Sequence, residues 1–420
     1  RVTSYRDAVG YLYGLKKRGV RLDLERMKQA VRFRGHPERA VPAIQIAGTN
    51  GKGSVSAMIA AIGRAAGVRT GLFTSPHLHR FVERIQINGR PIAERTLVRL
   101  LNQVRADFDK PGFPELSFYE TATLVAFEAF REAECELSVL EVGLGGRLDA
   151  TSVASPDVAL ITRVALDHTR ILGPDTASIA KEKAAIIQRG RPVVSGVDDP
   201  DAAAVVRQVA RRKRAPLLWL GRDFDAEGRR IRVGTEHFDV PRLGLRGGHQ
   251  WKNAACAVAA ARALGWDSID DSAIRRGLAN ARWPGRLERI AGSPSFLLDA
   301  AHNLDAAKAL ATYLDTQPKK RRTLLFGSLR DKDYRQILRV LEPHRVRAFY
   351  APISLWRGLD PRKLARAVPG TVVRSARDGI ARAKRSAGPD GEVIVAGSIF
   401  LMAEVRALLR NVRTEPPIAM

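Results

Sequence analysis

A glycine-rich loop between an apolar run and a helical pattern constrains this chain more than any other feature. Residues 48–54 read Gly-Thr-Asn-Gly-Lys-Gly-Ser and follow the apolar run Ala43–Ala47, which predicts a buried strand. Small residues let backbone N–H groups close around phosphate oxygens at a helix N-terminus, while Lys52 adds a positive charge and a hydroxyl can reach Mg²⁺. Compared with the common P-loop, this one is shorter and has an extra glycine after the lysine. A purely structural turn is the alternative, but the lysine and the preceding strand favour nucleotide binding.

Length and composition limit the class of protein. A chain of 420 residues is too long for one core, which predicts two domains. With 45% hydrophobic and 27% charged residues, the composition is that of an ordinary globular protein. Cys135 and Cys256 are isolated, which argues against a disulfide framework or a thiolate metal site. Residues 1–6 lack the apolar core of a signal peptide and no apolar run could span a bilayer, so we expect a cytoplasmic protein without a membrane partner.

The formal net charge of +26 is unusual and has two interpretations. One is binding to nucleic acid or to another polyanion. The other is compositional bias, because arginine is spread along the whole chain. The two densest basic runs, 211–214 and 319–322, each lie between a helical stretch and an apolar strand, where solvated connectors are expected. No aromatic residues alternate with them, as a single-strand binding surface would require. We therefore expect no specific nucleic-acid partner.

Strand and helix patterns alternate along most of the chain, which predicts an α/β fold with mainly parallel strands. Helical patterns include 121–132, 178–188, 250–264 and 272–280, and a hairpin is expected within 229–240. The break Trp283-Pro284-Gly285-Arg286 precedes a second strand–helix series. We expect a P-loop NTPase-like domain at 1–286 and a smaller Rossmann-like domain at 287–420. The expected strands are Ala43–Ala47, Val68–Thr74, Leu137–Val142, Val158–Thr162, Pro192–Gly196 and Leu217–Leu220, then Phe296–Asp299, Thr323–Phe326, Ala348–Ala351, Val372–Val373 and Glu392–Ala396.

Polar and acidic residues follow several of these strands, where open α/β sheets place their ligand crevice. Glu141 ends one strand, ahead of a glycine-rich block, and could hold Mg²⁺ or serve only as a turn partner. Ser75 could add a hydroxyl ligand or cap a turn. His168 by itself is more often a core histidine, and Lys183 by itself is more often a solvated salt-bridge partner on a helix. Each of these residues is weak evidence for a site by itself, and their order along the chain is the stronger evidence.

In that order the segments resemble one family, the folylpolyglutamate synthases and dihydrofolate synthases of the Mur ligase superfamily, and in particular its bifunctional bacterial members. The glycine-rich block at 143–151 is the most specific of them. The matching segments are Leu24–Met27, Gly48–Ser54, Ser75–Leu78, Glu141–Thr151, Ala165–Thr169, Glu182–Ala184, Asn253–Ala255, Pro284–Arg286, Asp299–Asn303 and Asp331–Asp333.

The resemblance implies roles for individual residues. Catalysis would involve Lys52, His168 and Lys183. Two magnesium ions would be held by Ser75, Glu141, His168 and an N-carboxylated Lys183. ATP would be bound by Thr49, Asn50, Gly51, Lys52, Gly53, Ser54, Asn253, Arg286, Asp299 and His302. The pteroate or folate acceptor would lie near Ser117, Tyr119, Glu120, Leu148, Asp149 and Ala150.

The activity that the resemblance implies is ATP-dependent addition of L-glutamate to dihydropteroate, to folate polyglutamates, or to both. An acyl phosphate would form on the acceptor carboxylate, and ADP and phosphate would be released. The protein would be a monomer, and its partners would be small-molecule substrates. Such chemistry needs charge neutralisation and alignment more than a covalent enzyme intermediate. The sequence offers no Ser-His-Asp or Cys-His arrangement that would argue for one.

Three positions depart from the family pattern, namely Asp23, Ser152 and Ala185 where Gly, Asn and Gly are common. None is an expected metal or phosphate ligand, but they bear on which folate form is preferred. A cell-wall Mur ligase is a second enzyme interpretation, although such proteins usually add an N-terminal UDP-sugar domain and the first strand here is expected at Ala43. A basic P-loop protein that uses ATP as a switch on nucleic acid is the alternative from another class. It predicts nucleic-acid-stimulated ATPase activity that falls steeply with salt.

Overall fold

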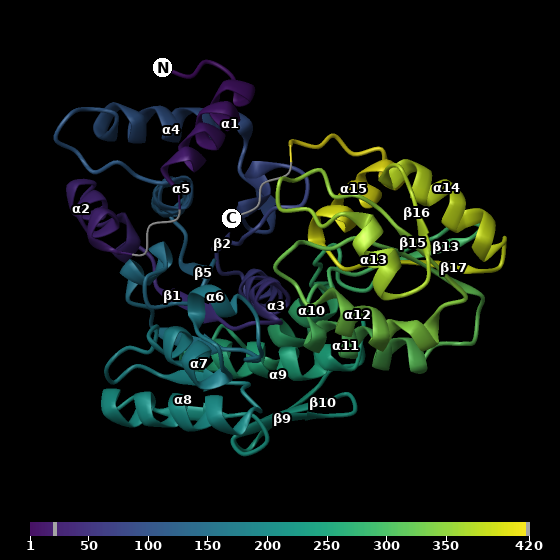
Figure 1. Ribbon diagram of the computed structural model, residues 1–420. Helices are drawn as coiled ribbons and strands as arrows, with labels where there is room; N and C mark the ends of the chain where they lie inside the picture. The colour runs from purple at the N-terminus through teal and green to yellow at the C-terminus, as the bar shows by residue number, and fades with distance from the viewer. Residues whose placement is uncertain (20–22, 417–420) are drawn as a thin grey trace.

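An eight-stranded sheet with the strand order β4-β3-β2-β5-β1-β6-β7-β8 forms the centre of the larger part of the chain (Figure 1). We describe it from a computed structural model that covers residues 1–19 and 23–416. From β2 to β8 every neighbouring pair is parallel, whereas β3 and β4 join one edge in antiparallel pairing. The strands are β1 Ala43–Ala47, β2 Thr70–Phe73, β3 Ile85–Ile87, β4 Arg90–Pro91, β5 Leu137–Glu141, β6 Val158–Ile161, β7 Val193–Ser195 and β8 Leu217–Trp219.

Helices cover both faces of this sheet because side chains on a strand alternate between its two sides. Ile44 and Ile46 of β1 belong to a core shared with α3, α9 and α10, while Ala43 and Ala47 pack into cores formed with α5 and with α7 and α8. All five β1 residues are buried, as the apolar run predicted. The helices of this part are α1 Tyr5–Gly14, α2 Glu25–Phe33, α3 Lys52–Ala65, α4 Glu94–Phe108, α5 Phe118–Glu132, α6 Thr169–Leu172, α7 Thr176–Ala184, α8 Pro200–Lys213, α9 His249–Arg262 and α10 Asp271–Asn280.

A small antiparallel sheet lies beside α9, in the order β11-β10-β9. Its strands are β9 Phe224–Glu227, β10 Arg230–Val233 and β11 Glu236–Asp239. The sequence predicted the hairpin of β10 and β11 and missed β9. Phe224, Ile231 and Phe238 are buried in the core that also contains α3 and α9.

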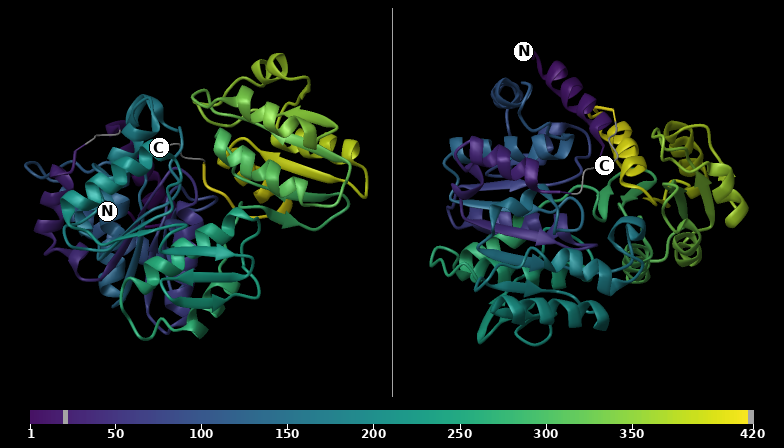
Figure 2. Two further views of the ribbon diagram at one scale, coloured as in Figure 1. Left: turned by 90° about the horizontal axis from the view of Figure 1, so that it is seen from below. Right: turned by 60° about the vertical axis from the view of Figure 1, so that its left-hand side comes forward.

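The remainder of the chain forms a six-stranded sheet in the order β12-β13-β17-β14-β15-β16 (Figure 2). All its pairs are parallel except β12 with β13. Together the sheets confirm the predicted α/β class with mainly parallel strands. The elements are β12 Glu288–Ile290, β13 Ser295–Leu298, α11 Leu304–Asp315, β14 Arg322–Phe326, α12 Tyr334–Leu341, β15 Arg347–Tyr350, α13 Pro361–Ala367, β16 Thr371–Val372, α14 Ala376–Ala387, β17 Glu392–Ala396 and α15 Ile399–Arg410.

After α15 the chain returns to the first part of the molecule. The Glu415 backbone N–H donates to the His79 carbonyl at 2.8 Å. The Glu415 carboxylate accepts hydrogen bonds from the Phe81 backbone at 2.9 Å, from the Tyr13 hydroxyl at 3.1 Å and from the Tyr5 hydroxyl. We call residues 411–416 the C-terminal strap, because they join the end of α15 to α1 and to the segment at 79–81.

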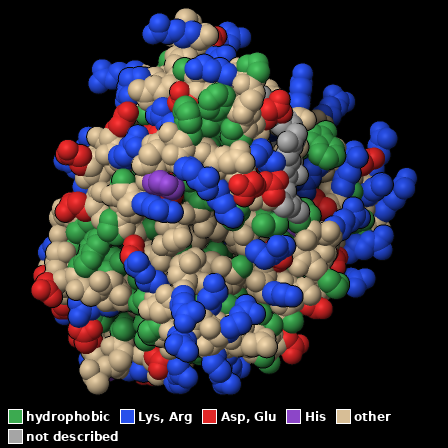
Figure 3. All heavy atoms as spheres, turned by 90° about the vertical axis from the view of Figure 1, so that its left-hand side faces the viewer, with side chains coloured by type: hydrophobic (Ala, Val, Ile, Leu, Met, Phe, Trp, Pro, Cys, Tyr) green, Lys and Arg blue, Asp and Glu red, His purple; other side chains and the backbone are tan. Residues whose placement is uncertain are grey.

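The basic runs do not form one surface feature. Arg211, Arg212 and Lys213 make the last turn of α8 rather than a connector, which suits the negative end of a helix dipole. Arg322, from the second run, is buried in an ion pair with Glu392. The face drawn in Figure 3 has Lys and Arg side chains scattered over it with acidic ones between them. Within the described residues, no helix has both the length and the apolar character to cross a membrane.

Candidate functional site

The loop between β1 and α3 depends on glycine at several positions. Gly48 and Gly51 have φ values of +155° and +91°, in the region that side chains disfavour. A Cβ atom at Gly48 would lie 1.8 Å from the Thr162 hydroxyl oxygen, and one at Gly53 would lie 2.6 Å from the Trp283 indole nitrogen. The extra glycine after the lysine is therefore required by the close approach of Trp283.

Lys52 begins α3 and curls back over this loop. Its ammonium group donates to the carbonyl oxygens of Gly48 at 3.0 Å and Thr49 at 3.3 Å. Burial lowers the pKa of Lys52, against the opposing effect of Glu141. The side chain thus places its amino group where the loop and the N-terminus of α3 would bind phosphate oxygens.

Neighbouring parallel strands bring Ser75 and Glu141 together at the carboxyl edge of the sheet. Ser75 follows β2 and Glu141 ends β5, next to β1 and its loop. The Ser75 backbone N–H donates to the Glu141 carboxylate at 3.1 Å. Glu141 is buried, and that burial raises the pKa of its carboxyl group. The Ser75 hydroxyl oxygen is also buried and has no hydrogen-bond partner among the described residues.

Lys183 lies in α7 but is not a solvated helix lysine. Its side chain is 4% exposed and donates to the Gly48 carbonyl at 3.0 Å, the same oxygen that Lys52 contacts. Burial, with the nearby charge of Lys52, lowers the pKa of Lys183 to about 7. A substantial fraction of this amine is therefore neutral at physiological pH.

His168 lies at the N-terminus of α6, in a left-handed backbone conformation with φ of +51°. Burial lowers the pKa of His168 to about 4, although its neighbour Asp167 acts in the opposite direction. The imidazole is therefore neutral near pH 7, which is the form that binds metal ions.

The residues present fit a magnesium ion. Mg²⁺ prefers oxygen ligands, and Ser75 offers an unpartnered buried hydroxyl beside the Glu141 carboxylate. Nowhere in the described ranges do three His, Cys, Asp or Glu side chains gather as a metal site. A cation at this position would therefore need donors of other kinds as well, such as the Ser75 hydroxyl.

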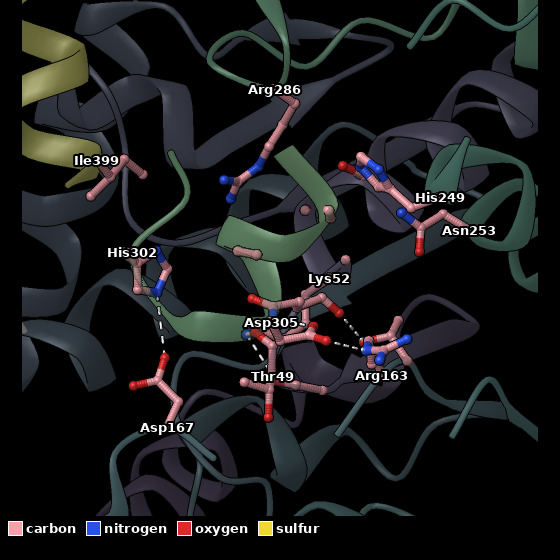
Figure 4. A pocket seen from close by; sticks show the side chains of 18 of the residues that line it. Thr49, Lys52, Arg163, Asp167, His249, Asn253, Arg286, His302, Asp305 and Ile399 are labelled. Atoms are coloured by element: carbon pink, nitrogen blue, oxygen red, sulfur yellow. Dashed lines mark hydrogen bonds and ion pairs between the residues drawn. The ribbon is translucent and has the colours of Figure 1, made fainter. Parts of the chain in front are cut away.

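The six-stranded sheet contributes the opposite wall of the same cavity, which has a volume of about 500 Å³ (Figure 4). Arg286 precedes β12, and Asp299 and His302 follow β13. The Asp299 carboxylate accepts hydrogen bonds from the backbone N–H groups of Leu287 and Ala301, so it joins the turn after β13 to the residue before β12. Asp299 does not cap the following helix, because Asn303 caps α11.

This cavity brings together residues that are far apart in the sequence. All the residues expected to bind ATP and metal line it, namely Thr49, Asn50, Gly51, Lys52, Gly53, Ser54, Ser75, Glu141, His168, Lys183, Asn253, Arg286, Asp299 and His302.

The residues expected to contact the acceptor form a separate group behind the glycine-rich turn. Tyr119 packs against Gly143, where an added Cβ atom would lie 2.7 Å from the tyrosine ring. The buried Asp149 carboxylate accepts hydrogen bonds from the backbones of Gly143 and Leu144 and from Thr151. Ser117, Glu120, Leu148 and Ala150 belong to this group as well and, like Tyr119 and Asp149, are not among the residues that line the 500 Å³ cavity.

The sequence did not predict the contacts between the larger part of the chain and the part that contains the six-stranded sheet. Lys332, in the loop between β14 and α12, forms an ion pair of 2.5 Å with Asp167, and His302 lies 3.4 Å from the same carboxylate. The Asn50 side chain donates to Asp305 at 2.8 Å. The segment containing Lys332 was among the matching motifs, whereas nothing in the sequence singled out Asp305.

Comparison with known proteins agrees with this architecture. Residues 119–261 match the Mur ligase middle domain, and residues 285–399 match the glutamate ligase domain of Mur ligases. The chain is 34% identical to a dihydrofolate synthase/folylpolyglutamate synthase of Bacillus subtilis, over 97% of this chain and 100% of that protein. The chain belongs to the folylpolyglutamate synthase/dihydrofolate synthase family.

Other relatives place this family member in context. It is 35% identical to a probable bifunctional folylpolyglutamate synthase/dihydropteroate synthase of Haloferax volcanii, over 96% of this chain but only 50% of that longer protein. Among solved structures, FolC of Escherichia coli in complex with DHPP and ADP has a TM-score of 0.91 at 32% identity, covering 98% of each chain. A bifunctional synthase with Mn, AMPPNP and L-glutamate bound has a TM-score of 0.88 at 32% identity, covering 97% of this chain and 98% of that one.

Proposed function

We propose that this chain joins L-glutamate to dihydropteroate, to (tetrahydro)folate polyglutamates, or to both. The reaction is ATP-dependent, passes through an acyl phosphate and releases ADP and phosphate. Membership of the family supports the proposal, as do the molecules bound in related structures: DHPP and ADP in one, Mn, AMPPNP and L-glutamate in the other.

The observation that carries the proposal is the composition of one cavity. A phosphate-binding loop, the hydrogen-bonded pair Ser75 and Glu141, and Lys183 face residues that flank the second sheet across it. Phosphoryl transfer to a carboxylate needs charge neutralisation and exclusion of water, and two walls from two sheets can provide both. The proposed division at residues 1–286 and 287–420 places this cavity at the domain seam.

The proposed residue roles are those that the family resemblance implies, and the position of these residues around one cavity supports them. Backbone N–H groups at residues 49–54 and the Lys52 ammonium bind the ATP phosphates, and Arg286, Asp299, His302 and Asn253 hold the rest of the nucleotide. Mg²⁺, when bound, neutralises charge on the transferring phosphoryl group. An acceptor carboxylate oxygen attacks the γ-phosphorus, and ADP leaves. The glutamate amine then attacks the acyl carbon, and phosphate leaves with loss of a proton from nitrogen.

We further propose that Lys183 is N-carboxylated and that two magnesium ions share the site. The depressed pKa of Lys183 supports this, because only the neutral amine attacks CO₂, losing a proton as the N–C bond forms. The resulting carbamate replaces a buried cation by an oxygen donor in the cavity that Ser75 and Glu141 also line. Hard cations prefer such a donor.

ADP release tests the proposed reaction. Purified protein with Mg²⁺ and ATP is given dihydropteroate or tetrahydrofolate, each with and without L-glutamate. We expect product amide, with ADP in equal amount, only when acceptor and glutamate are both present. Omission of glutamate from the same mixture is the matched control. ATP hydrolysis driven by RNA or DNA alone, without amide formation, would instead support the nucleic-acid switch and refute the ligase.

A further inference from the structure

Arg84 is a fully buried arginine beside the proposed acceptor residues. It ends the 3-10 turn η3, Phe81–Arg84, and precedes β3. Its side chain is 0% exposed, and its Nε donates to the His77 Nδ1 atom at 2.9 Å. Both terminal nitrogens, Nη1 and Nη2, are buried and have no hydrogen-bond partner in the described part of the chain. Buried polar groups normally have partners, so these two nitrogens require an explanation.

The surroundings of Arg84 are aromatic and positively charged. Its guanidinium carbon lies 5.2 Å from the ring centroid of Phe118 and 5.9 Å from that of Phe81. Lys16 is close by, and burial together with the Arg84 charge lowers the pKa of Lys16 to about 8. Over the residues that the structure describes, Arg84 forms no ion pair, although every side-chain nitrogen of an arginine is a donor.

The nearest acidic groups are already engaged. Glu83 lies next to Arg84 in the sequence, but its carboxylate accepts the backbone N–H groups of Leu78, His79 and Arg80. The Glu141 carboxylate accepts the backbone N–H of Ser75 and belongs to the proposed metal site. Tyr13 and Tyr119 also lie near the guanidinium, as neutral phenols. The cluster of Arg84, Lys16 and His77 therefore lacks an anion.

The position of Arg84 indicates which anion is missing. Phe118, against the guanidinium, lies between the proposed acceptor residues Ser117 and Tyr119. His77, the Nε partner, is two residues after the proposed metal ligand Ser75. The two free nitrogens of a planar guanidinium match the two oxygens of a carboxylate. The Tyr119 hydroxyl lies 3.5 Å from the Glu141 carbonyl oxygen, and both residues act on the Arg84 charge, so Arg84 lies near the acceptor residues and near the proposed metal end.

We propose that Arg84 is a carboxylate subsite that binds the α-carboxylate of the terminal glutamate of a folate acceptor. The inference rests on the proposed function, in which the γ-carboxylate of that glutamate reacts at the Ser75 and Glu141 end. Dihydropteroate has one carboxylate, which must react, so it leaves Arg84 without a partner. Arg84 thus favours folate acceptors over dihydropteroate and selects the γ-carboxylate as the nucleophile. Because the guanidinium has no exposed surface, an acceptor reaches it only when side chains packed on it, which include Phe81 and Phe118, move aside.

Acceptor analogues test the subsite in the wild-type protein. Tetrahydropteroyl-4-aminobutyrate keeps the reacting carboxylate of tetrahydrofolate and lacks only the α-carboxylate. We expect its Kd, measured by fluorescence titration without ATP, and its kcat/KM to be worse by about ten- to a hundredfold, as for loss of a charged hydrogen bond. Equal binding and turnover of the two compounds by the wild type would overturn the inference while leaving the ligase intact. No turnover of any acceptor, dihydropteroate included, would refute the proposed function and the subsite with it.

The variant Arg84→Met should erase this preference, so that the ratio of kcat/KM for tetrahydrofolate to that for the aminobutyrate analogue falls towards one. The ratio for tetrahydrofolate to dihydropteroate should fall as well. Arg80→Met is the matched control, since Arg80 lies at the start of the same turn and pairs with Glu94, and both ratios should stay at wild-type values. A structural role of Arg84 in ring packing would instead lower the melting temperature and all three activities together, with the ratios preserved. That pattern would overturn the subsite.

Discussion

Removing the amine of Lys183 should make the metal-free protein more stable while abolishing its activity. The pKa of Lys183 is lowered from 10.5 to about 7, and each unit corresponds to about 1.4 kcal/mol. Holding this side chain charged in the folded state therefore costs about 4 to 5 kcal/mol below pH 7. Lys183→Met removes that cost together with one hydrogen bond to Gly48, worth about 1 kcal/mol. The expected net gain in the free energy of unfolding is about 3 kcal/mol at pH 7.

The sign of the pH dependence gives a second check on the same variant. Between pH 7 and pH 10.5 the unfolded chain keeps the Lys183 proton and the folded chain loses it, so wild-type stability rises with pH in this window. The advantage of Lys183→Met should therefore shrink as pH rises towards 10.5.

Urea and thermal unfolding, in CO₂-free buffer with a chelator at pH 7 and pH 10, measure both effects. Lys181→Met, an exposed lysine of the same helix, is the control and should change little. A Lys183→Met protein that is less stable than wild type, or a difference independent of pH, would refute the reasoning. Bicarbonate and Mg²⁺ should stabilise the wild type only, if the amine becomes a carbamate.

Two further substitutions test residues that are proposed to bind ATP. Lys52→Ala should remove ligase turnover without lowering the melting temperature, because the side chain contacts loop carbonyls rather than a core; a variant that keeps wild-type kcat would contradict its role. Arg286→Ala should raise the KM for ATP by about tenfold or more, as expected for loss of a charged contact, with unchanged melting temperature. An unaltered ATP dependence in a kinetic titration would place the nucleotide elsewhere.

Most of the parallel strands could be predicted from the sequence because they are buried on both faces and read as apolar runs, whereas β8 and β16 are only partly buried. Each expected parallel strand is present, with ends that differ by a residue or two. The strands β3, β4 and β12 were missed, since they are short and partly polar. They depend on pairing, β3 with β2, β4 with β3 and β12 with β13. Local pattern cannot supply such pairing.

In the candidate site too, features made by neighbouring residues could be predicted from the sequence, whereas contacts between residues far apart in the sequence could not. The loop around Lys52 is contiguous, so its geometry was readable from the sequence alone. The burial of Lys183 was not, because it depends on contact with Gly48, which lies 135 positions away. Arg84 gave no signal at all, since an arginine at the end of a short turn is ordinarily a solvated residue. The pair Asp167 and Lys332 spans 165 positions and depends on how the two sheets meet.

The C-terminal strap makes the two halves of the molecule mechanically dependent on each other. Four hydrogen bonds join Glu415 to α1 and to residues 79–81, each worth about 1 kcal/mol. Any rotation of the six-stranded sheet must either break them or pull on the chain between Ser75 and Arg84. A movement that changes the distance between the two walls of the cavity would then also change the shape of the region around the proposed acceptor residues. A protein shortened after Arg410, or carrying a bulky fusion there, would lack this link, so its two sites would move independently, unlike those of the intact chain.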